Sequence, residues 1–230
     1  MASPLEITNA TQDTTLTEWT PTSNQNTIGE LNIRTGADVY LDFFSIIEFP
    51  LVWGTDIPAG VVITSATMSL YYWDKAANDP VGRTIDCQRL LRTDWVEAQA
   101  TWNIYKTGSN WDTAGALNST TDYSTTHKAS QTVPSGYGWM TWTVTDLVKD
   151  FQTAGTSLHF RLSDSVRNNA TAYRISLEDS ESATNRPKMT INYTTGWANI
   201  ASINGVASAD IASINGVAVA GIAKINSVTV

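Results

Sequence analysis

The stretch Ala66-Thr67-Met68-Ser69-Leu70-Tyr71-Tyr72-Trp73 decides the fold class, because residues suited to a core occupy every second position in it. Its even-numbered residues form one face and its odd-numbered residues the other, which is the period of a β-strand. The same alternation returns at residues 158–163, 173–178 and 189–193. Because strands buried on both faces are continuously apolar, this pattern predicts antiparallel sheets with one face in solvent.

Turn-forming residues separate the predicted strands, as in Asn78-Asp79-Pro80 and Pro134-Ser135-Gly136. These residues supply the backbone angles that tight turns require. One short helix is predicted from Thr145, as its N-cap, to Phe151, with Gly155 ending it. Many short strands linked by turns predict an all-β fold, an antiparallel β-sandwich of jelly-roll type.

The composition argues against several classes of protein. The chain has 22 acidic and 14 basic residues, a net charge of −8, and its cations are scattered, so we expect no nucleic-acid partner. No apolar stretch approaches the roughly 18 residues of a membrane helix, so we expect no membrane partner. The single Cys87 cannot form an internal disulfide and is expected to be buried. Residues Met1–Ile7 lack the basic and apolar regions of a secretory signal, which predicts a protein made in the cytoplasm and not exported.

An eleven-residue repeat follows the last predicted strand. Ile200–Ala207 returns as Ile211–Ala218 and, with changes, as Ile222–Thr229. Each copy places Asn-Gly or Asn-Ser between short apolar runs, which is the strongest local signal for a tight β-hairpin. We therefore predict two units, a β-sandwich at residues 1–195 and a three-copy β-repeat, here called the repeat segment, at residues 196–230.

The repeat segment is expected to bind other chains. From Trp197 onward only Asp210 and Lys224 are charged, and isolated hairpins are marginally stable in water. Such hairpins are expected to pack against copies of the same chain, for which a trimer would fit, or against another protein. The predicted interface comprises the apolar and turn residues of the copies, namely Ile200, Ile203, Asn204, Gly205, Val206, Ile211, Ile214, Asn215, Gly216, Val217, Ile222, Ile225, Asn226 and Val228.

Three parts of the main domain carry a resemblance to a known family. They are Ile57–Gly60 with Ile63–Leu70, then Trp95–Asn103, and finally Glu181 with Pro187–Ile191. They are similar, in turn, to the strand-leading, W-x-E-x-x-x-T-W and closing-strand patterns of the DNRLRE family, a β-sandwich module also grouped with carbohydrate-binding modules. The resemblance implies a sandwich and leaves the function open, because family members occur on bacterial surfaces, beside polysaccharide-active enzymes and in phage particles.

The sequence predicts no catalytic site. Glycoside hydrolysis needs two carboxylates flanking a cleft. Asp94 and Glu97, beside Trp95 and Trp102, form the best pair, and we interpret them as a turn cap and solvated charges around buried indoles. No phosphate-binding loop or nucleophile motif stands out, so we expect the protein not to be an enzyme.

No metal site is predicted either. Zinc needs several His or Cys ligands, and His127, His159 and Cys87 are too few. Calcium is kept as the alternative cofactor, because loops with Asn78-Asp79 and with Asp112 offer oxygen ligands, although no spaced calcium-loop motif accompanies them.

Nine tryptophans are a marked excess. Trp139 and Trp142 lie three apart on one predicted strand and therefore point to opposite faces, so at least one of them should meet solvent or a partner. An exposed indole can stack on a sugar ring, and with Trp111 these are the predicted contacts for a host surface glycan. The alternative is that they serve the core or a protein interface.

These observations together predict a non-enzymatic structural protein of a phage particle. The repeat segment resembles repeats at the ends of phage structural proteins, and that resemblance implies a virion location. We expect a capsid decoration or cement protein, or a tail or fibre accessory, whose partners are copies of itself and another virion protein such as the major capsid protein. The alternative is a carbohydrate-binding module of a cell-surface or polysaccharide-degrading system.

Overall fold

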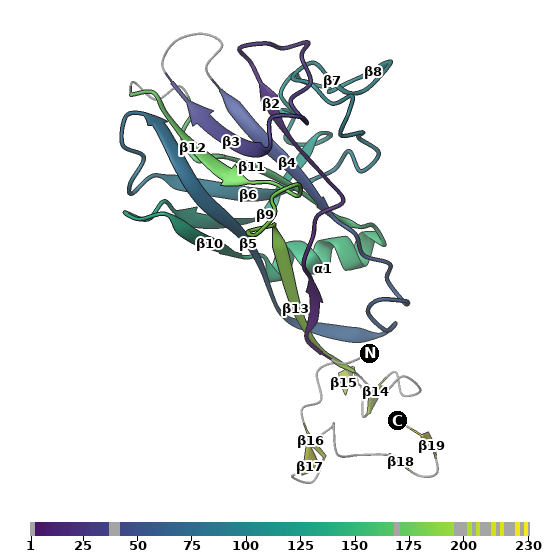
Figure 1. The fold of residues 1–230 in the computed structure, drawn as a ribbon. Coiled ribbons are helices and arrows are strands. Elements are labelled where there is room, and N and C mark those ends of the chain that lie inside the picture. The colour runs from purple at the N-terminus through teal and green to yellow at the C-terminus, as the bar shows by residue number, and fades with distance from the viewer. Residues whose placement is uncertain are drawn as a thin grey trace.

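The chain adopts an all-β, sandwich-like fold made of curled antiparallel sheets, as the alternation predicts (Figure 1). The structure is a computed structural model that describes residues 3–36, 42–167 and 171–195, and six two-residue strands between residues 202 and 229. Within these residues it contains one α-helix.

The main body is built from β1 (Leu5–Ile7), β2 (Gln12–Thr17), β3 (Glu30–Thr35), β4 (Phe43–Phe49), β5 (Val61–Ala77), β6 (Thr84–Leu90), β7 (Ile104–Lys106), β8 (Ser109–Asn110), β9 (Tyr123–Thr132), β10 (Gly138–Thr143), α1 (Thr145–Ala154), β11 (Leu158–Asp164), β12 (Tyr173–Glu178) and β13 (Lys188–Thr195). Except for the separate β7–β8 pair, all of these strands belong to one sheet of eleven strands, ordered β1-β13-β5-β12-β3-β4-β11-β6-β9, with β10 pairing to β5 and β2 to β4.

The sheet curls so that its two halves enclose a shared core. The halves meet between β3 and β4. These two strands pair through a single position, where Arg34 lies opposite Phe43 in the antiparallel register. Buried side chains from β3, β5, β10, β12 and β13 in one half and from β4, β6, β9 and β11 in the other form a single hydrophobic cluster. Cys87, on β6, belongs to this cluster and is buried, which confirms the expectation for it.

The long strand β5 organises one half of the sheet. It pairs with β10 along residues 67–72, with β13 along residues 61–69 and with β12 along residues 72–77. Met68, Leu70 and Tyr72 point into the core and are at most 1% exposed, whereas Trp73 is 40% exposed. The predicted alternation is therefore confirmed on this strand.

The predicted helix is present and longer than expected, because α1 extends to Ala154. It packs against β5 and β9 (Figure 1). Gly155 ends it in the left-handed conformation, at a φ of 68°, as predicted. The prediction that Thr145 caps the helix is wrong, because Val144 takes the N-cap position. The Thr145 hydroxyl instead accepts a hydrogen bond from the backbone N–H of Ala66 at 3.0 Å and so ties the helix to β5.

A second hydrophobic cluster lies on the opposite face of β4. Residues 91–122 cross that face and cover it. The cluster consists of Leu16, Phe44, Ile46, Leu90, Trp95, Ala100, Trp102, Trp111 and Ala116. Trp102 stacks on Phe44 with ring centroids 5.3 Å apart. The tryptophan-rich stretch Trp95–Asn103 therefore supplies a second core.

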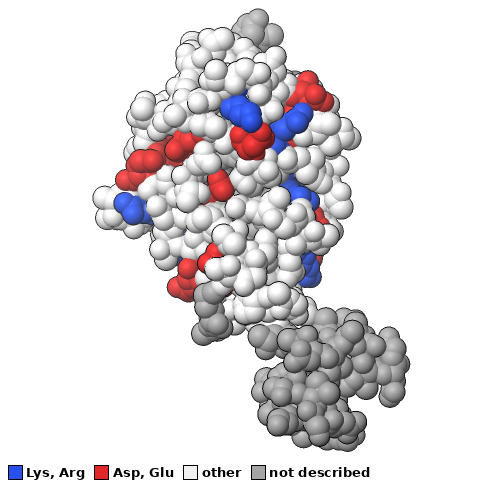
Figure 2. Space-filling model, turned by 90° about the vertical axis from the view of Figure 1, so that its right-hand side faces the viewer, with Lys and Arg blue, Asp and Glu red and all other residues white. Residues whose placement is uncertain are grey.

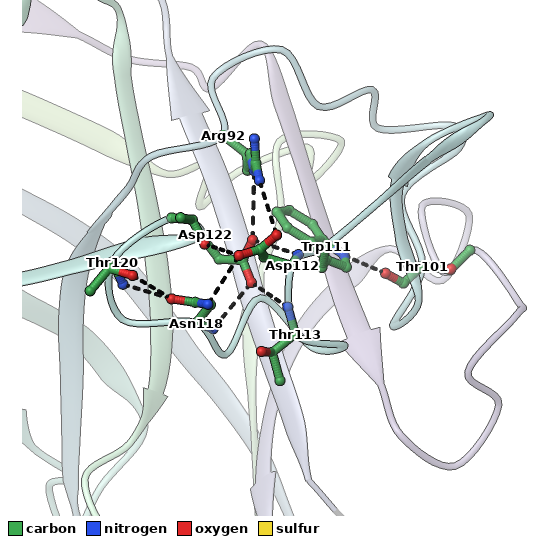
Figure 3. A network of polar contacts seen from close by, with 9 residues as sticks. Arg92, Thr101, Trp111, Asp112, Thr113, Asn118, Thr120 and Asp122 are labelled. Carbon is green, nitrogen blue, oxygen red and sulfur yellow. Dashed lines mark hydrogen bonds and ion pairs between the residues drawn. The ribbon is translucent and has the colours of Figure 1, made fainter.

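The carboxylate of Asp122 holds the covering segment together (Figure 3). It is fully buried and accepts backbone N–H groups of Asp112, Thr113 and Asn118 at 2.9, 3.0 and 3.1 Å. Arg92 places its Nε 3.6 Å from the same carboxylate. A buried carboxylate needs such donors, and through them it joins three separate loop positions.

The repeat segment contains three antiparallel pairs, β14 (Ser202–Ile203) with β15 (Val206–Ala207), β16 (Ser213–Ile214) with β17 (Val217–Ala218), and β18 (Lys224–Ile225) with β19 (Val228–Thr229). Ile203 pairs with Val206, and the equivalent residues pair in the other two copies. The prediction that each copy forms its own hairpin pairing is confirmed for these strands.

Candidate functional site

An aromatic pair lies on the outer face of β5 and β10. Trp139 sits opposite Tyr71 in the register, and their rings meet edge-to-face with centroids 5.5 Å apart. Trp139 is 40% exposed because its position on β10 points away from the core. An indole held by a neighbouring ring and open to solvent on a sheet is a preorganised stacking surface.

Hydroxyl groups continue this face along the sheet. The hydroxyls of Ser69 on β5 and Thr141 on β10 are 2.9 Å apart and hydrogen-bonded. Lys188 on β13 is the register partner of Ser69 on its other side. Alternation places Trp139 and Thr141 on one face of β10, so indole, hydroxyls and ammonium share one surface.

A groove of about 330 Å³ opens beside Trp139. It is lined by Thr8, Trp139, Ala183, Thr184, Arg186 and Lys188, and we call it the Trp139 groove. The Lys188 ammonium lies 3.8 Å from the Trp139 ring centroid, a cation–π contact. The Arg186 Nε–H donates to the carbonyl oxygen of Ser182 at 2.8 Å, which anchors its side chain to the loop before β13.

The predicted sugar contacts divide into one exposed and two buried indoles. Trp142 is 0% exposed and donates to the Ile85 carbonyl at 2.9 Å. Trp111 is 3% exposed and donates to the Thr101 carbonyl at 2.9 Å. Their assignment as glycan contacts is wrong, since neither ring has an open face. The expectation that Trp139 and Trp142 face opposite ways, with one in solvent, is confirmed.

Sequence reasoning missed a further exposed tryptophan, in addition to Trp73 and Trp139. Trp19 is 64% exposed at the rim of an open groove of about 410 Å³. The groove is lined by Thr15, Thr17, Trp19, Thr20, Ser23, Gln25, Ile28, Glu30, Asn32, Phe43 and Arg174. The cation in this groove, Arg174, lies 4.0 Å from Glu30 and 3.6 Å from Asp74. The position of Trp19 in a polar turn after β2 was the sequence signal that could have found it.

Sequence reasoning also missed a cluster of four carboxylates. Oxygens of Asp13, Asp179 and Glu181 lie within 4.8 Å of one another, and Glu97 accepts the backbone N–H of Asp13 at 3.0 Å. Burial, followed by the charges of Asp179 and Glu181, raises the pKa of Asp13 to about 8. Burial also raises the pKa of Asp179 and of Glu97.

The raised pKa of Asp13 favours retention of a proton in this cluster. A pKa of about 8 keeps Asp13 protonated at neutral pH, and its Oδ2 accepts the backbone N–H of Ser180 at 2.9 Å. Among the described residues, Asp13, Asp179 and Glu181 are the side chains whose spacing would allow them to hold a cation such as calcium. The arrangement is also explained without an ion, because one shared proton relieves the repulsion between carboxylates.

The carboxylates considered for glycoside hydrolysis have separate structural contacts. Asp94 is exposed and pairs with Lys106, whose hydrogen bond lowers the Asp94 pKa. Glu97 is half-buried and its carboxylate holds the edge of β2 through the Asp13 backbone N–H. The interpretation of solvated charges therefore fits Asp94 and is wrong for Glu97, because Glu97 belongs to the acidic cluster.

The loops kept for calcium hold their carboxylates with protein donors. Asp79 accepts the Lys75 ammonium at 2.7 Å. Asp112 accepts Nδ2 of Asn118 at 3.0 Å and the hydroxyl of Thr121 at 2.7 Å. Neighbouring side chains therefore occupy one oxygen of each carboxylate, Oδ1 of Asp79 and Oδ2 of Asp112.

Six of the predicted interface residues lie in the paired strands of the repeat segment. These are Ile203, Val206, Ile214, Val217, Ile225 and Val228. The remaining eight lie outside the described residues, and they are Ile200, Asn204, Gly205, Ile211, Asn215, Gly216, Ile222 and Asn226.

Charges of both signs are mixed on the face of the main body in Figure 2, where most of the surface is uncharged. In the described part of the chain, no helix has the length and apolarity needed to cross a bilayer. Compared with known families and curated proteins, the sequence matches no family model and no curated protein. The resemblance to the DNRLRE family therefore stays a prediction.

Proposed function

We propose that this chain is a non-enzymatic structural protein of a phage particle, a capsid decoration or cement protein or a tail or fibre accessory. In this proposal the repeat segment attaches to copies of the chain and to another virion protein, and the sandwich is displayed. The observation that carries the proposal is that each repeat copy forms its own short antiparallel pair.

Short separate pairs favour assembly for a physical reason. A two-stranded hairpin is at best marginally stable alone, and each pair here has two residues per strand. Strand edges offer backbone groups that a neighbouring strand can bind, which gives attachment without charge. Three copies multiply this effect, because once one copy is bound the others act at a high local concentration.

The register indicates which residues should carry the attachment. Ile203 pairs with Val206, whereas Ala207 pairs with Ser202. In a β-hairpin, paired residues share a face and neighbours alternate, so we expect the Ile/Val pair of each copy on one face and the other pair, which is Ser/Ala in the first two copies, on the opposite face. The equivalent pairs in the third copy are Ile225 with Val228 and Lys224 with Thr229.

The test compares two triple variants of the full chain. One carries Ile203→Asp, Ile214→Asp and Ile225→Asp, and its matched control carries Ala207→Asp, Ala218→Asp and Thr229→Asp. Each adds three negative charges, one per copy. We expect light scattering to find an oligomer for the wild type and the control, and a monomer for the isoleucine variant.

The virion location is tested on particles. Virus particles made with the wild-type gene or with the control should contain the chain, as measured by mass spectrometry of purified particles. Particles made with the isoleucine variant should lack it. Absence of the wild-type chain from the particles, or equal incorporation of both triple variants, would contradict the proposal.

A glycan-binding module is the second candidate. Its specific support is the exposed Trp139, which lines a groove together with Thr8 and Thr184. The two proposals are compatible, because the groove belongs to the sandwich and the attachment residues belong to the repeat segment.

A further inference from the structure

Two exposed cations among the described residues of this acidic protein form no ion pair. Eight of the described Lys and Arg side chains form ion pairs with carboxylates, namely Lys75, Arg83, Arg92, Lys106, Lys128, Lys149, Arg167 and Arg174. Arg34, Arg89 and Arg161 lie over aromatic rings and are buried or half-buried. Among the described residues, Arg186 and Lys188 are the exposed cations without a carboxylate within ion-pair distance.

Both of these cations line the Trp139 groove. In a chain with a net charge of −8, two neighbouring cations without ion pairs leave a local positive site next to an exposed indole. Arg186 keeps further guanidinium N–H donors available, because its one hydrogen bond uses Nε. Lys188 has a long flexible side chain that can leave the indole face and follow an anion.

The groove therefore fits a ligand that combines a flat face with a negative charge. The indole matches the C–H face of a sugar ring, and the hydroxyls of Thr8 and Thr184, which line the groove, match polar ring substituents. A volume of about 330 Å³ is at the lower end of the range of roughly 300–1,000 Å³ for small-molecule sites, which suits one or two sugar rings.

We propose that the Trp139 groove binds a sugar that carries a carboxylate, with its ring on the indole of Trp139 and its carboxylate paired with Lys188 and Arg186. The planar guanidinium of Arg186 supplies the geometry for a two-point contact with a carboxylate. This inference rests on the second candidate function, glycan binding, and it can fail without affecting attachment to a particle.

The test measures binding of the full chain to three probes, trigalacturonic acid, a glucuronic acid trisaccharide and N-acetylneuraminic acid, by isothermal titration calorimetry at low salt. At least one probe should bind, and affinity should fall with added salt because the contact is ionic. The matched neutral probe is the methyl ester of trigalacturonic acid, or of whichever acid binds. It should bind about tenfold more weakly or worse, which corresponds to about 1.4 kcal/mol.

Variants assign the two parts of the contact. Trp139→Ala should abolish binding of the acid and of its ester. Lys188→Gln and Arg186→Gln should each lower the affinity for the acid by about tenfold and leave the affinity for the ester unchanged. Two control variants go with them. Trp73→Ala removes an exposed tryptophan of β5 that lies outside the groove lining. Lys149→Gln removes an exposed cation of α1 that is paired with Asp146.

Each result decides for or against the proposal. If none of the three acids binds, if acid and ester bind equally, or if Trp139→Ala binds as the wild type does, the proposal is wrong. It is equally wrong if Lys149→Gln weakens the acid as much as Lys188→Gln, because the effect would then be one of net charge.

Discussion

The indole N–H of Trp95 donates to Nδ1 of His159 at 3.2 Å, which links the segment of residues 91–122 to β11. Both residues are at most 3% exposed. Because Nδ1 accepts this bond, the ring must be neutral with its proton on Nε2, which lies 3.7 Å from Oε1 of Glu48. A proton added to Nδ1 would remove the acceptor of this hydrogen bond and leave the buried indole N–H without it.

Acid should therefore weaken the protein through His159. Burial lowers the pKa of this group, and the nearby Glu48 opposes that effect without reversing it. A lowered pKa means that the stabilisation is complete above about 6.5, the unfolded value, and is lost as the pH falls toward the folded value. Urea unfolding should show a smaller loss of stability between pH 7.5 and 5 for His159→Gln than for the wild type. An equal loss in both proteins would show that His159 is not responsible.

The acidic cluster should respond to pH in the opposite direction. The pKa of Asp13 is raised to about 8 in the folded protein. The contribution of Asp13 to the free energy of unfolding is therefore fully favourable below about 3.8, the unfolded pKa, and is lost as the pH rises toward 8. Asp13→Asn keeps an acceptor for Ser180 and removes the charge, so it should raise the free energy of unfolding at pH 8 by at least about 1 kcal/mol. That gain should disappear near pH 4.

The matched control for Asp13 is Asp94→Asn. The exposed Asp94 has its pKa lowered by Lys106, so loss of its charge should not stabilise the protein at pH 8. Calcium at millimolar concentration should leave the midpoint of thermal unfolding of the wild type unchanged. A calcium-dependent rise that Asp13→Asn abolishes would contradict a protonated Asp13.

Gly115 is expected to be sensitive to substitution, because a Cβ at this position would lie 2.6 Å from Cη2 of Trp102. Gly115→Ala should cost about 3 kcal/mol or more, from backbone strain at a φ of +81° plus displacement of the indole. Gly108→Ala is the control, since Gly108 has a φ of +77° and no heavy atom within 4 Å of the added Cβ. Gly108→Ala should lower the free energy of unfolding, measured by chemical denaturation, by only about 1 kcal/mol. Equal costs would rule out the Trp102 contact.

Asp122 is expected to matter far more than its neighbour Asp112. Asp122→Asn replaces one carboxylate oxygen by an amide that cannot accept, so at least one of its three backbone N–H groups loses its partner. We expect a loss of about 2–3 kcal/mol in the free energy of unfolding. Asp112→Asn changes a half-exposed carboxylate and should cost less than about 1 kcal/mol. A similar cost for both would mean that Asp122 does not hold the segment.

The sequence alone was enough to recognise the repeating patterns of the chain. Alternation along residues 66–73 assigned Leu70 and Tyr72 to the core face, and the structure buries both. The Asn-Gly spacing indicated that Ile203 and Val206 pair, and they do. These are local properties, since side chains on a strand alternate by covalent geometry and a two-residue turn sets the register of its strands.

What covers each face was decided by tertiary structure alone. The face of β4 that alternation turns away from the main core is covered by residues 91–122, which buries Trp111 in a second core, whereas the outer face of β10 leaves Trp139 open. The close approach of Asp13 to Asp179 likewise results from tertiary packing. Alternation determines on which side of a strand a residue lies, but exposure and pKa depend on which distant segment packs against that side, and no local pattern encodes that choice.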